Sequence, residues 1–170
     1  MQKNFDGIML DFPAVTLKIG DRIYSPDEAF FDCEDLTIEV TCEKRADIWY
    51  KRVEVTAKRP LPTPDYLEVD RQTIDDATVE RRGYMPTSQK DDPSVEEEEG
   101  SGVTPGCGYP IVGKNFFTGL AHPAGFNEVE EQNEKTTTYH LRHHPVWQED
   151  GKLEVIEAVF CVADDPEQAF

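Results

Sequence analysis

Hydrophobic and polar residues alternate with a period of two along much of the chain, and no long stretch has the spacing of a helix. In the segment 36–43 every second residue is apolar, which predicts a strand with one buried and one solvent-facing side. The same alternation over 15–19, followed by Gly20-Asp21 and then 22–24, predicts a β-hairpin.

The alternation changes phase in the next apolar segment. Ile48 and Tyr50 have one parity, whereas the apolar positions within 53–57 have the other. A β-bulge near Lys51-Arg52 would bring both halves onto one buried face, and we therefore expect one there.

Further strands are predicted over 66–70, 136–143 and 153–162. The last of these is apolar on both faces except at Glu154 and Glu157, which indicates a strand covered by a second layer, with 148–151 as the tight turn before it. The predicted fold is an all-β antiparallel β-sandwich in one domain, 1–170, with little helix beyond a short one after Asp164 or Asp165.

The segment 75–108 differs from the rest because it is rich in Pro, Gly and charge and poor in apolar residues. Within it, the run from Asp91 to Glu99 holds six acidic residues and no basic one. This composition predicts a long, exposed, acidic loop between strands.

Composition narrows the possible partners. The 170 residues include 17 basic and 35 acidic ones, a net charge of −18, which repels nucleic acids and anionic membranes and excludes both as expected partners. No apolar run approaches the ~18 residues of a membrane span, and the first residues lack the apolar stretch of a signal peptide. The sequence indicates no particular cellular compartment.

Apolar residues make up 38%, which predicts a thin core, but 10% aromatic residues argue against disorder.

The cysteines form no CxxC pair and have no histidine at zinc-ligand spacing. We therefore expect no structural zinc, and thiols that are mostly free and buried rather than disulfide-bonded, at Cys33, Cys42, Cys107 and Cys161.

The segment 109–127 is dense in Gly, Pro, aromatic and hydrogen-bonding residues. Aromatic rings stack on the apolar faces of sugars, whereas Asn, His and Lys side chains read hydroxyl groups. The candidates are Tyr109, Phe116, Phe117 and Phe126 for stacking and Lys114, Asn115, His122 and Asn127 for hydrogen bonding. The alternative, which composition alone favours, is a structural corner in which these side chains pack.

A second cluster lies in the predicted strand before Pro145. On a strand His140, Arg142 and His144 share one face and His143 takes the other, so a metal site would need a further ligand such as His122. We predict no metal site and no cofactor, since no nucleotide-binding or zinc-protease motif occurs. No catalytic residue can be named, and a buried Glu157 would need a partner.

One group of residues within 116–127 is more specific than the general composition of 109–127. It consists of Phe116-Phe117, Gly119-Leu120, His122-Pro123, Gly125 and Asn127. It resembles the N-terminal galactose-mutarotase-like β-sandwich of large bacterial glycoside hydrolase-type proteins of the α-galactosidase and raffinose-synthase group. The segment 49–56 also fits this resemblance, whereas the acidic run does not.

The resemblance implies a supersandwich-like fold and a fragment of a larger protein, in which Ala169-Phe170 leads to a catalytic (β/α)₈ barrel. The implied function is a noncatalytic domain that supports or covers the sugar site of that barrel, so the partners are carbohydrate and the downstream catalytic domain. The implied carbohydrate-binding residues are Trp49, Tyr109, Asn115, Phe116, His122 and Asn127.

Two other functions stay open. One is a free-standing carbohydrate-binding module. The other is a small mutarotase-like sugar epimerase, in which His122 or His143 pairs with a carboxylate such as Glu157. An acidic adhesion domain that binds calcium lacks the DxDxDG-like ligand spacing.

Overall fold

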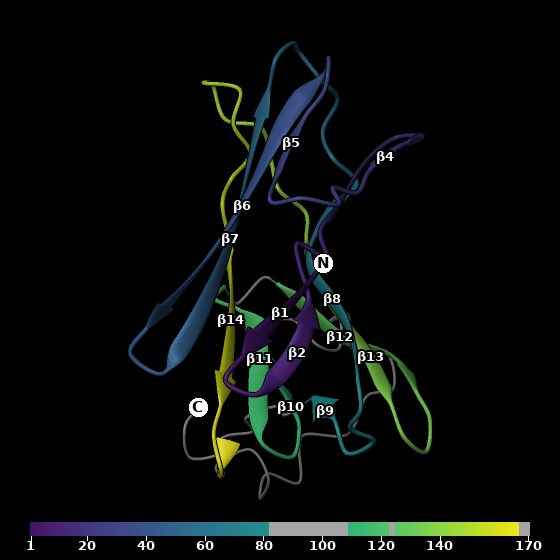
Figure 1. The fold of residues 1–170 in the computed structure, drawn as a ribbon. Coiled ribbons are helices and arrows are strands. Elements are labelled where there is room, and N and C mark those ends of the chain that lie inside the picture. The colour runs from purple at the N-terminus through teal and green to yellow at the C-terminus, as the bar shows by residue number, and fades with distance from the viewer. Residues whose placement is uncertain (82–108, 123–124, 167–170) are drawn as a thin grey trace, which may run out of the picture.

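The computed structural model describes residues 1–81, 109–122 and 125–166, and it is built almost entirely of strands (Figure 1). They are β1 (Gln2–Phe5), β2 (Ile8–Asp11), β3 (Thr16–Ile19), β4 (Arg22–Tyr24), β5 (Phe30–Asp32), β6 (Leu36–Arg45), β7 (Ile48–Ala57), β8 (Tyr66–Ile74), β9 (Glu80–Arg81), β10 (Ile111–Val112), β11 (Phe116–Leu120), β12 (Phe126–Gln132), β13 (Thr137–His143) and β14 (Glu157–Val162).

The strands form two main antiparallel sheets and a small hairpin. The seven-stranded sheet has the order β5-β6-β7-β14-β11-β10-β9, and the five-stranded sheet has the order β12-β13-β8-β3-β4. The hairpin β1–β2 lies in front of the space between them in Figure 1. The predicted all-β antiparallel sandwich is therefore confirmed, as is the hairpin formed by β3 and β4. The acidic run from Asp91 to Glu99 lies outside the described residues.

The core lies between the facing sides of the two sheets, where the predicted alternation places the apolar side chains. Leu36 and Ile38 of β6 and Leu67 of β8 are almost completely buried. Phe116 joins the two layers, because its ring stacks on Phe160 of the seven-stranded sheet at 5.4 Å and on Tyr139 of the five-stranded sheet at 6.5 Å, both between centroids.

The predicted bulge in β7 is wrong. Strand β7 pairs with β6 in continuous register from Ala57 opposite Leu36 to Ile48 opposite Arg45, and its pairing with β14 is also unbroken. The apparent phase change arises because Lys51 occupies an inward position and is buried, whereas Arg52 on the other face is exposed. A charged residue at a core position thus imitated a bulge in the pattern.

Three other differences concern the ends of two strands and the role of one turn. β14 begins at Glu157 rather than at residue 153, and β8 continues beyond residue 70 to Ile74. The turn 148–151 closes a short bridge between Trp147 and Leu153. It does not join two paired strands, because β13 and β14 belong to different sheets. The expected terminal helix falls mainly on 167–170, outside the described residues.

The hairpin β1–β2, which the hydrophobic pattern did not predict, packs on the core through aromatic contacts. The Phe5 ring meets Trp49 of β7 at 5.1 Å and Phe160 of β14 at 5.8 Å, both edge-on. The Gln72 side chain of β8 both donates to and accepts from the backbone of Asp11, at 2.8 Å each. The hairpin is therefore attached to both sheets.

The described cysteines Cys33, Cys42 and Cys161 are free thiols, as expected. Cys161 is buried, whereas Cys33 and Cys42 are half-buried. Cys107 lies outside the described residues.

Candidate functional site

Two residues of the predicted carbohydrate-binding set are inside the protein. Phe116 is only 1% exposed, and so is Asn127. The Asn127 amide accepts a hydrogen bond from the Leu120 backbone N–H at 3.0 Å and donates one to the Tyr109 carbonyl at 2.8 Å. Both side chains therefore have structural roles: Asn127 holds the corner between β11 and β12 together, and Phe116 packs between the two sheets.

Trp49 is half-buried at the edge of the core. Its indole N–H donates to Asp6 at 2.8 Å, and the Lys3 and Lys44 ammonium groups lie 5.4 Å and 5.8 Å from its ring centroid. Phe5 covers its edge. In this arrangement the ring is used to hold the β1–β2 hairpin.

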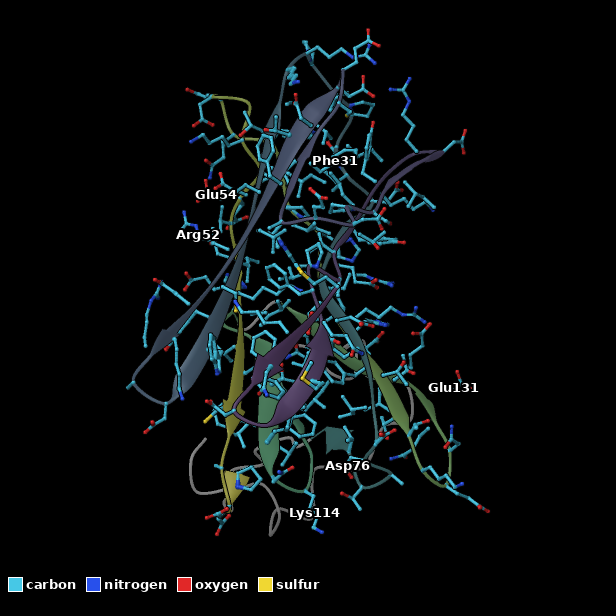
Figure 2. All side chains as sticks on the ribbon, in the orientation of Figure 1. Phe31, Arg52, Glu54, Asp76, Lys114 and Glu131 are labelled. Atoms are coloured by element: carbon cyan, nitrogen blue, oxygen red, sulfur yellow. The ribbon has the colours of Figure 1, made fainter. Side chains whose placement is uncertain are left out.

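The remaining three residues are at the surface but are not gathered into one site. Asn115 lines a depression of 550 Å³ between the β1–β2 hairpin and the end of β8. Figure 2 shows the neighbouring Lys114 close to Asp76, whose carboxylate accepts the Lys114 backbone N–H at 2.8 Å. His122 lines a different and larger groove, and Tyr109 is 41% exposed.

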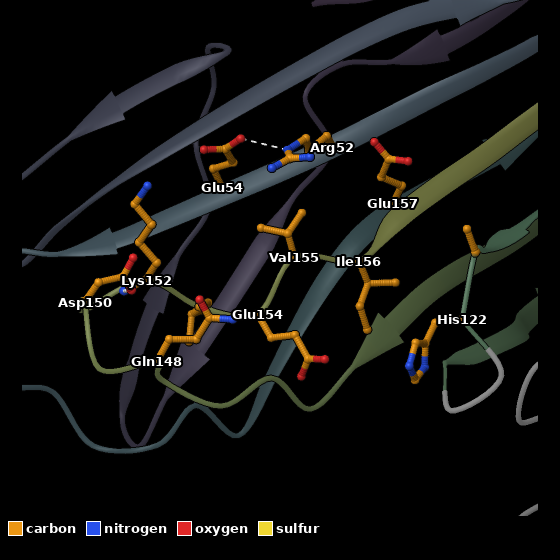
Figure 3. A pocket seen from close by; sticks show the side chains of 12 residues that line it. Arg52, Glu54, His122, Gln148, Asp150, Lys152, Glu154, Val155, Ile156 and Glu157 are labelled. Atoms are coloured by element: carbon orange, nitrogen blue, oxygen red, sulfur yellow. Dashed lines mark hydrogen bonds and ion pairs between the residues drawn. The ribbon is translucent and has the colours of Figure 1, made fainter.

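This larger groove, which we call the His122 groove, has a volume of 630 Å³ and is open to solvent (Figure 3). Its lining comes from the outer face of β7, from the residues after β11 and from the segment that leads into β14. The lining residues are Arg52, Glu54, Ala121, His122, Gln148, Asp150, Lys152, Leu153, Glu154, Val155, Ile156 and Glu157.

Backbone hydrogen bonds build the groove. Gly151, which has a positive φ of 77°, closes the turn by donating to the Gln148 carbonyl at 3.0 Å. The Leu153 N–H then donates to the Val55 carbonyl at 3.0 Å, and the Ala121 N–H donates to the Glu157 carbonyl at 2.7 Å. These bonds hold the segment before β14 alongside β7 and place His122 next to it.

The groove presents charges of both signs. The Arg52 guanidinium donates to Glu54 at 2.7 Å, as the dashed line in Figure 3 marks. The Glu157 carboxylate contacts Arg45 at 3.3 Å, so this carboxylate has the partner that the sequence required. In Figure 3 the Glu157 side chain points to the Arg52 side of the groove, while the His122 ring lies beyond Ile156.

A buried histidine lies near this groove. His143 is only 3% exposed, and burial lowers its pKa to about 4, with the charges of His122 and His144 adding to the effect. Its Nε2 has no hydrogen-bond partner among the described residues. His143 is therefore neutral at pH 7.

The other histidines confirm the predicted distribution of faces. His140 lies on the outer face of the five-stranded sheet, where its Nε2 is 2.9 Å from the Glu128 carboxylate. His144 packs edge-on against Phe126, with 5.3 Å between ring centroids. Within the described ranges, no three His, Cys, Asp or Glu side chains are grouped so that they could hold a metal ion.

Comparisons with known proteins give no further assignment: no family model, no curated protein and no solved structure matches this chain. Among the described residues, no helix has the length and apolar character needed to cross a membrane.

Most residues of the groove were missed by the sequence reasoning. The segment 148–157 was interpreted as a turn followed by a buried strand, although its mixture of Gln, Asp, Lys and Glu was the available signal. Arg52 and Glu54 could not be found this way, because their place in the groove depends on the segment that lies against β7.

Proposed function

We propose that this chain is a noncatalytic β-sandwich domain of a carbohydrate-active protein, and that the His122 groove is its sugar-facing surface. The observation that carries the proposal is the lining of this groove. Its 630 Å³ volume falls within the ~300–1,000 Å³ typical of small-molecule sites. Several polar side chains from separate segments converge on it.

The chemistry of the lining suits a neutral ligand with many hydroxyl groups. Each hydroxyl can donate one hydrogen bond and accept others. Glu54, Asp150 and Glu154 supply acceptors, while Arg52 and Lys152 supply donors. Because the two signs are mixed, the groove favours a neutral polar ligand over an ion.

The family resemblance supports the same choice of surface. Within the resembling pattern, Asn127 maintains the corner between β11 and β12, and His122 lines the groove. In this proposal the domain supports or covers the sugar site of a downstream (β/α)₈ barrel in the same protein.

Backbone amide shifts of the ¹⁵N-labelled chain, titrated with galactose and with raffinose, test the proposal. We expect weak binding, with dissociation constants of roughly 1 mM or above, and shifts concentrated at Ala121, His122, Lys152 and Glu154. Shifts confined to the depression beside Asn115, or no shifts at saturating sugar, would overturn it.

Substitutions make the test specific. Glu154→Gln and His122→Ala should weaken binding severalfold, since each removes a hydrogen-bonding group from the groove. Glu131→Gln is the matched control because Glu131 is exposed on β12, away from the groove in Figure 2, and it should leave binding unchanged.

Two measurements separate this proposal from the binding-module and epimerase alternatives. A dissociation constant of roughly 10 µM or below in the absence of any barrel would favour a free-standing carbohydrate-binding module. Polarimetry of freshly dissolved α-galactose tests the epimerase. A faster optical change with the protein, lost in His122→Ala, would favour that enzyme.

A further inference from the structure

A Lys–Asp pair stands at the centre of the sandwich, apart from the His122 groove. The Lys51 Nζ of β7 lies 2.5 Å from the Asp70 Oδ1 of β8. The two residues are only 8% and 6% exposed, respectively. Because β7 belongs to the seven-stranded sheet and β8 to the five-stranded sheet (Figure 1), this contact spans the two layers.

The surroundings of this pair are largely aromatic and aliphatic, with Gln72 and Thr118 as polar neighbours. A cavity of 20 Å³ lies beside it, bounded by Phe5 and Phe12 from the N-terminal segment and by Trp49 and Phe160 from the seven-stranded sheet. Burial raises the pKa of the nearby Tyr139 hydroxyl well above its ordinary value, and the Asp70 charge adds to this. The Tyr139 hydroxyl therefore stays neutral beside the pair.

The Asp70 carboxyl group is held in place. The Gln72 side-chain N–H donates to the same Oδ1 at 2.9 Å. Gln72 is itself fixed by its two hydrogen bonds to the Asp11 backbone. The oxygen that Lys51 contacts thus has a positioned donor, and the adjacent Cγ is held next to the amine.

We propose that Lys51 and Asp70 condense to form an intramolecular isopeptide bond between Nζ and Cγ, which links the two sheets covalently. A buried ion pair loses the hydration of both charges, whereas the amide carries no charge. Burial beneath the β1–β2 hairpin keeps the two groups together and leaves them little contact with solvent.

The reaction balances without any other reactant. One proton passes from the Lys51 ammonium to Oδ2 of the Asp70 carboxylate, which gives a neutral amine and a carboxylic acid whose carbonyl oxygen is Oδ1. The Nζ electron pair attacks Cγ, and the C=O π electrons move onto Oδ1, where the Gln72 N–H stabilises the developing negative charge.

The carbonyl then re-forms as the bond from Cγ to its hydroxyl oxygen breaks. The hydroxyl takes a proton from the nitrogen and leaves as one water molecule. The 20 Å³ cavity is large enough to receive that molecule, since a single water needs roughly 10–15 Å³ by this measure. Nothing is oxidised or reduced.

Exposed Lys–Asp pairs in the same chain provide internal controls. Lys44 contacts Asp6 with side chains 35% and 34% exposed, and Lys58 contacts Asp32 with side chains 40% and 51% exposed. These pairs are hydrated, so they stay ion pairs, and trypsin should cleave normally after both lysines.

The intact mass of the reduced, denatured full chain tests the proposal. We expect a mass lower than the sequence mass by one water molecule. Trypsin should release the peptides 46–52 and 59–71 joined to each other, with no cleavage after Lys51. A mass equal to the sequence mass would overturn the proposal directly, without any variant.

Two variants show which residues lose the water molecule. Lys51→Arg removes the nucleophile while keeping the charge, and its mass should equal its sequence mass. Asp70→Asn should instead lose one ammonia molecule, because the amide nitrogen is then the leaving group. A water loss that persists in Lys51→Arg must come from another site, such as cyclisation at Asp6-Gly7 or Asp150-Gly151, and would also overturn the proposal.

Discussion

Lys51 and Arg52 are neighbours on β7, yet they belong to two different regions of the molecule. Lys51 points between the sheets to Asp70, where its side chain is 10% exposed, whereas Arg52 points to the His122 groove and is 45% exposed. Both are cations with a carboxylate partner. The comparison teaches that the energetic value of a charge pair here depends on the face of the strand, because only one face is covered by a second sheet.

The largest expected effect comes from breaking the core pair on one side. Lys51→Met leaves the Asp70 carboxylate buried without its cation and removes the proposed amide link, and we expect a loss of at least about 3–5 kcal/mol in the free energy of unfolding. Urea denaturation followed by tryptophan fluorescence measures it. The double variant Lys51→Met/Asp70→Leu also lacks the proposed amide link, so it should recover only the part of the loss that comes from leaving the Asp70 charge buried. A double variant as unstable as the single one would contradict this explanation.

The next largest effect is the pH dependence of stability that buried His143 causes. His143 has a pKa of about 4 in the folded protein, against ~6.5 when unfolded. Between these values the unfolded state binds more protons, so stability falls as the pH is lowered from about 6.5 to 4, by roughly 3 kcal/mol at most.

Unfolding free energies of the wild type and of His143→Leu at pH 7 and pH 5 check this prediction. The variant should lose this part of the pH dependence. His144→Gln should lose only a small part of the pH dependence, because burial is the main cause of the lowered His143 pKa and the exposed His144 only adds to it. An equal pH dependence in His143→Leu and the wild type would show that His143 does not cause it.

A smaller loss of stability distinguishes Asn127, which is buried, from Asn115, which is at the surface. Asn127→Ala leaves the Leu120 N–H and the Tyr109 carbonyl without their buried partner, which should cost about 1–3 kcal/mol. Asn115→Ala, at an exposed position, should change stability by less than ~0.5 kcal/mol. Thermal unfolding of both variants tests the difference, and equal losses would contradict the assigned role of Asn127.

The smallest effect is expected in the groove. Glu54→Gln removes the partner of Arg52, and because both side chains are more than 40% exposed, we expect a change in stability of at most ~1 kcal/mol. Sugar binding should weaken while stability is kept. A loss of stability as large as that of Lys51→Met would remove the distinction between the two faces of β7.

Local alternation was enough to predict the strand class of most segments. The segment 36–43 was assigned correctly because Leu36, Ile38 and Val40 all face the core. The segment 53–57 was also assigned correctly, but Lys51 broke the pattern, since its inward position becomes acceptable only when Asp70 of another sheet lies opposite. The local alternation of apolar and polar residues contains no information about a partner as distant as Asp70.

The candidate site was less accessible from the sequence. The aromatic and hydrogen-bonding character of 109–127 was evident, but whether Phe116, Asn127 and His122 face the core or solvent depends on the packing of β11 between β10 and β14 and on the corner that leads to β12. Most of the groove residues come from 148–157, whose place against β7 is set by long-range backbone hydrogen bonds.

Taken alone, the sequence therefore specified β-structure, antiparallel layers and the polarity of the surface, because strand geometry makes neighbouring side chains face opposite ways. It could not specify which face each segment presents to which partner. That choice was made by the tertiary structure, which brought Asp70 to Lys51, the β1–β2 hairpin over both, and the segment before β14 to Arg52. Covering one face of a strand with distant residues is what turns two adjacent cations into a core pair and a surface site.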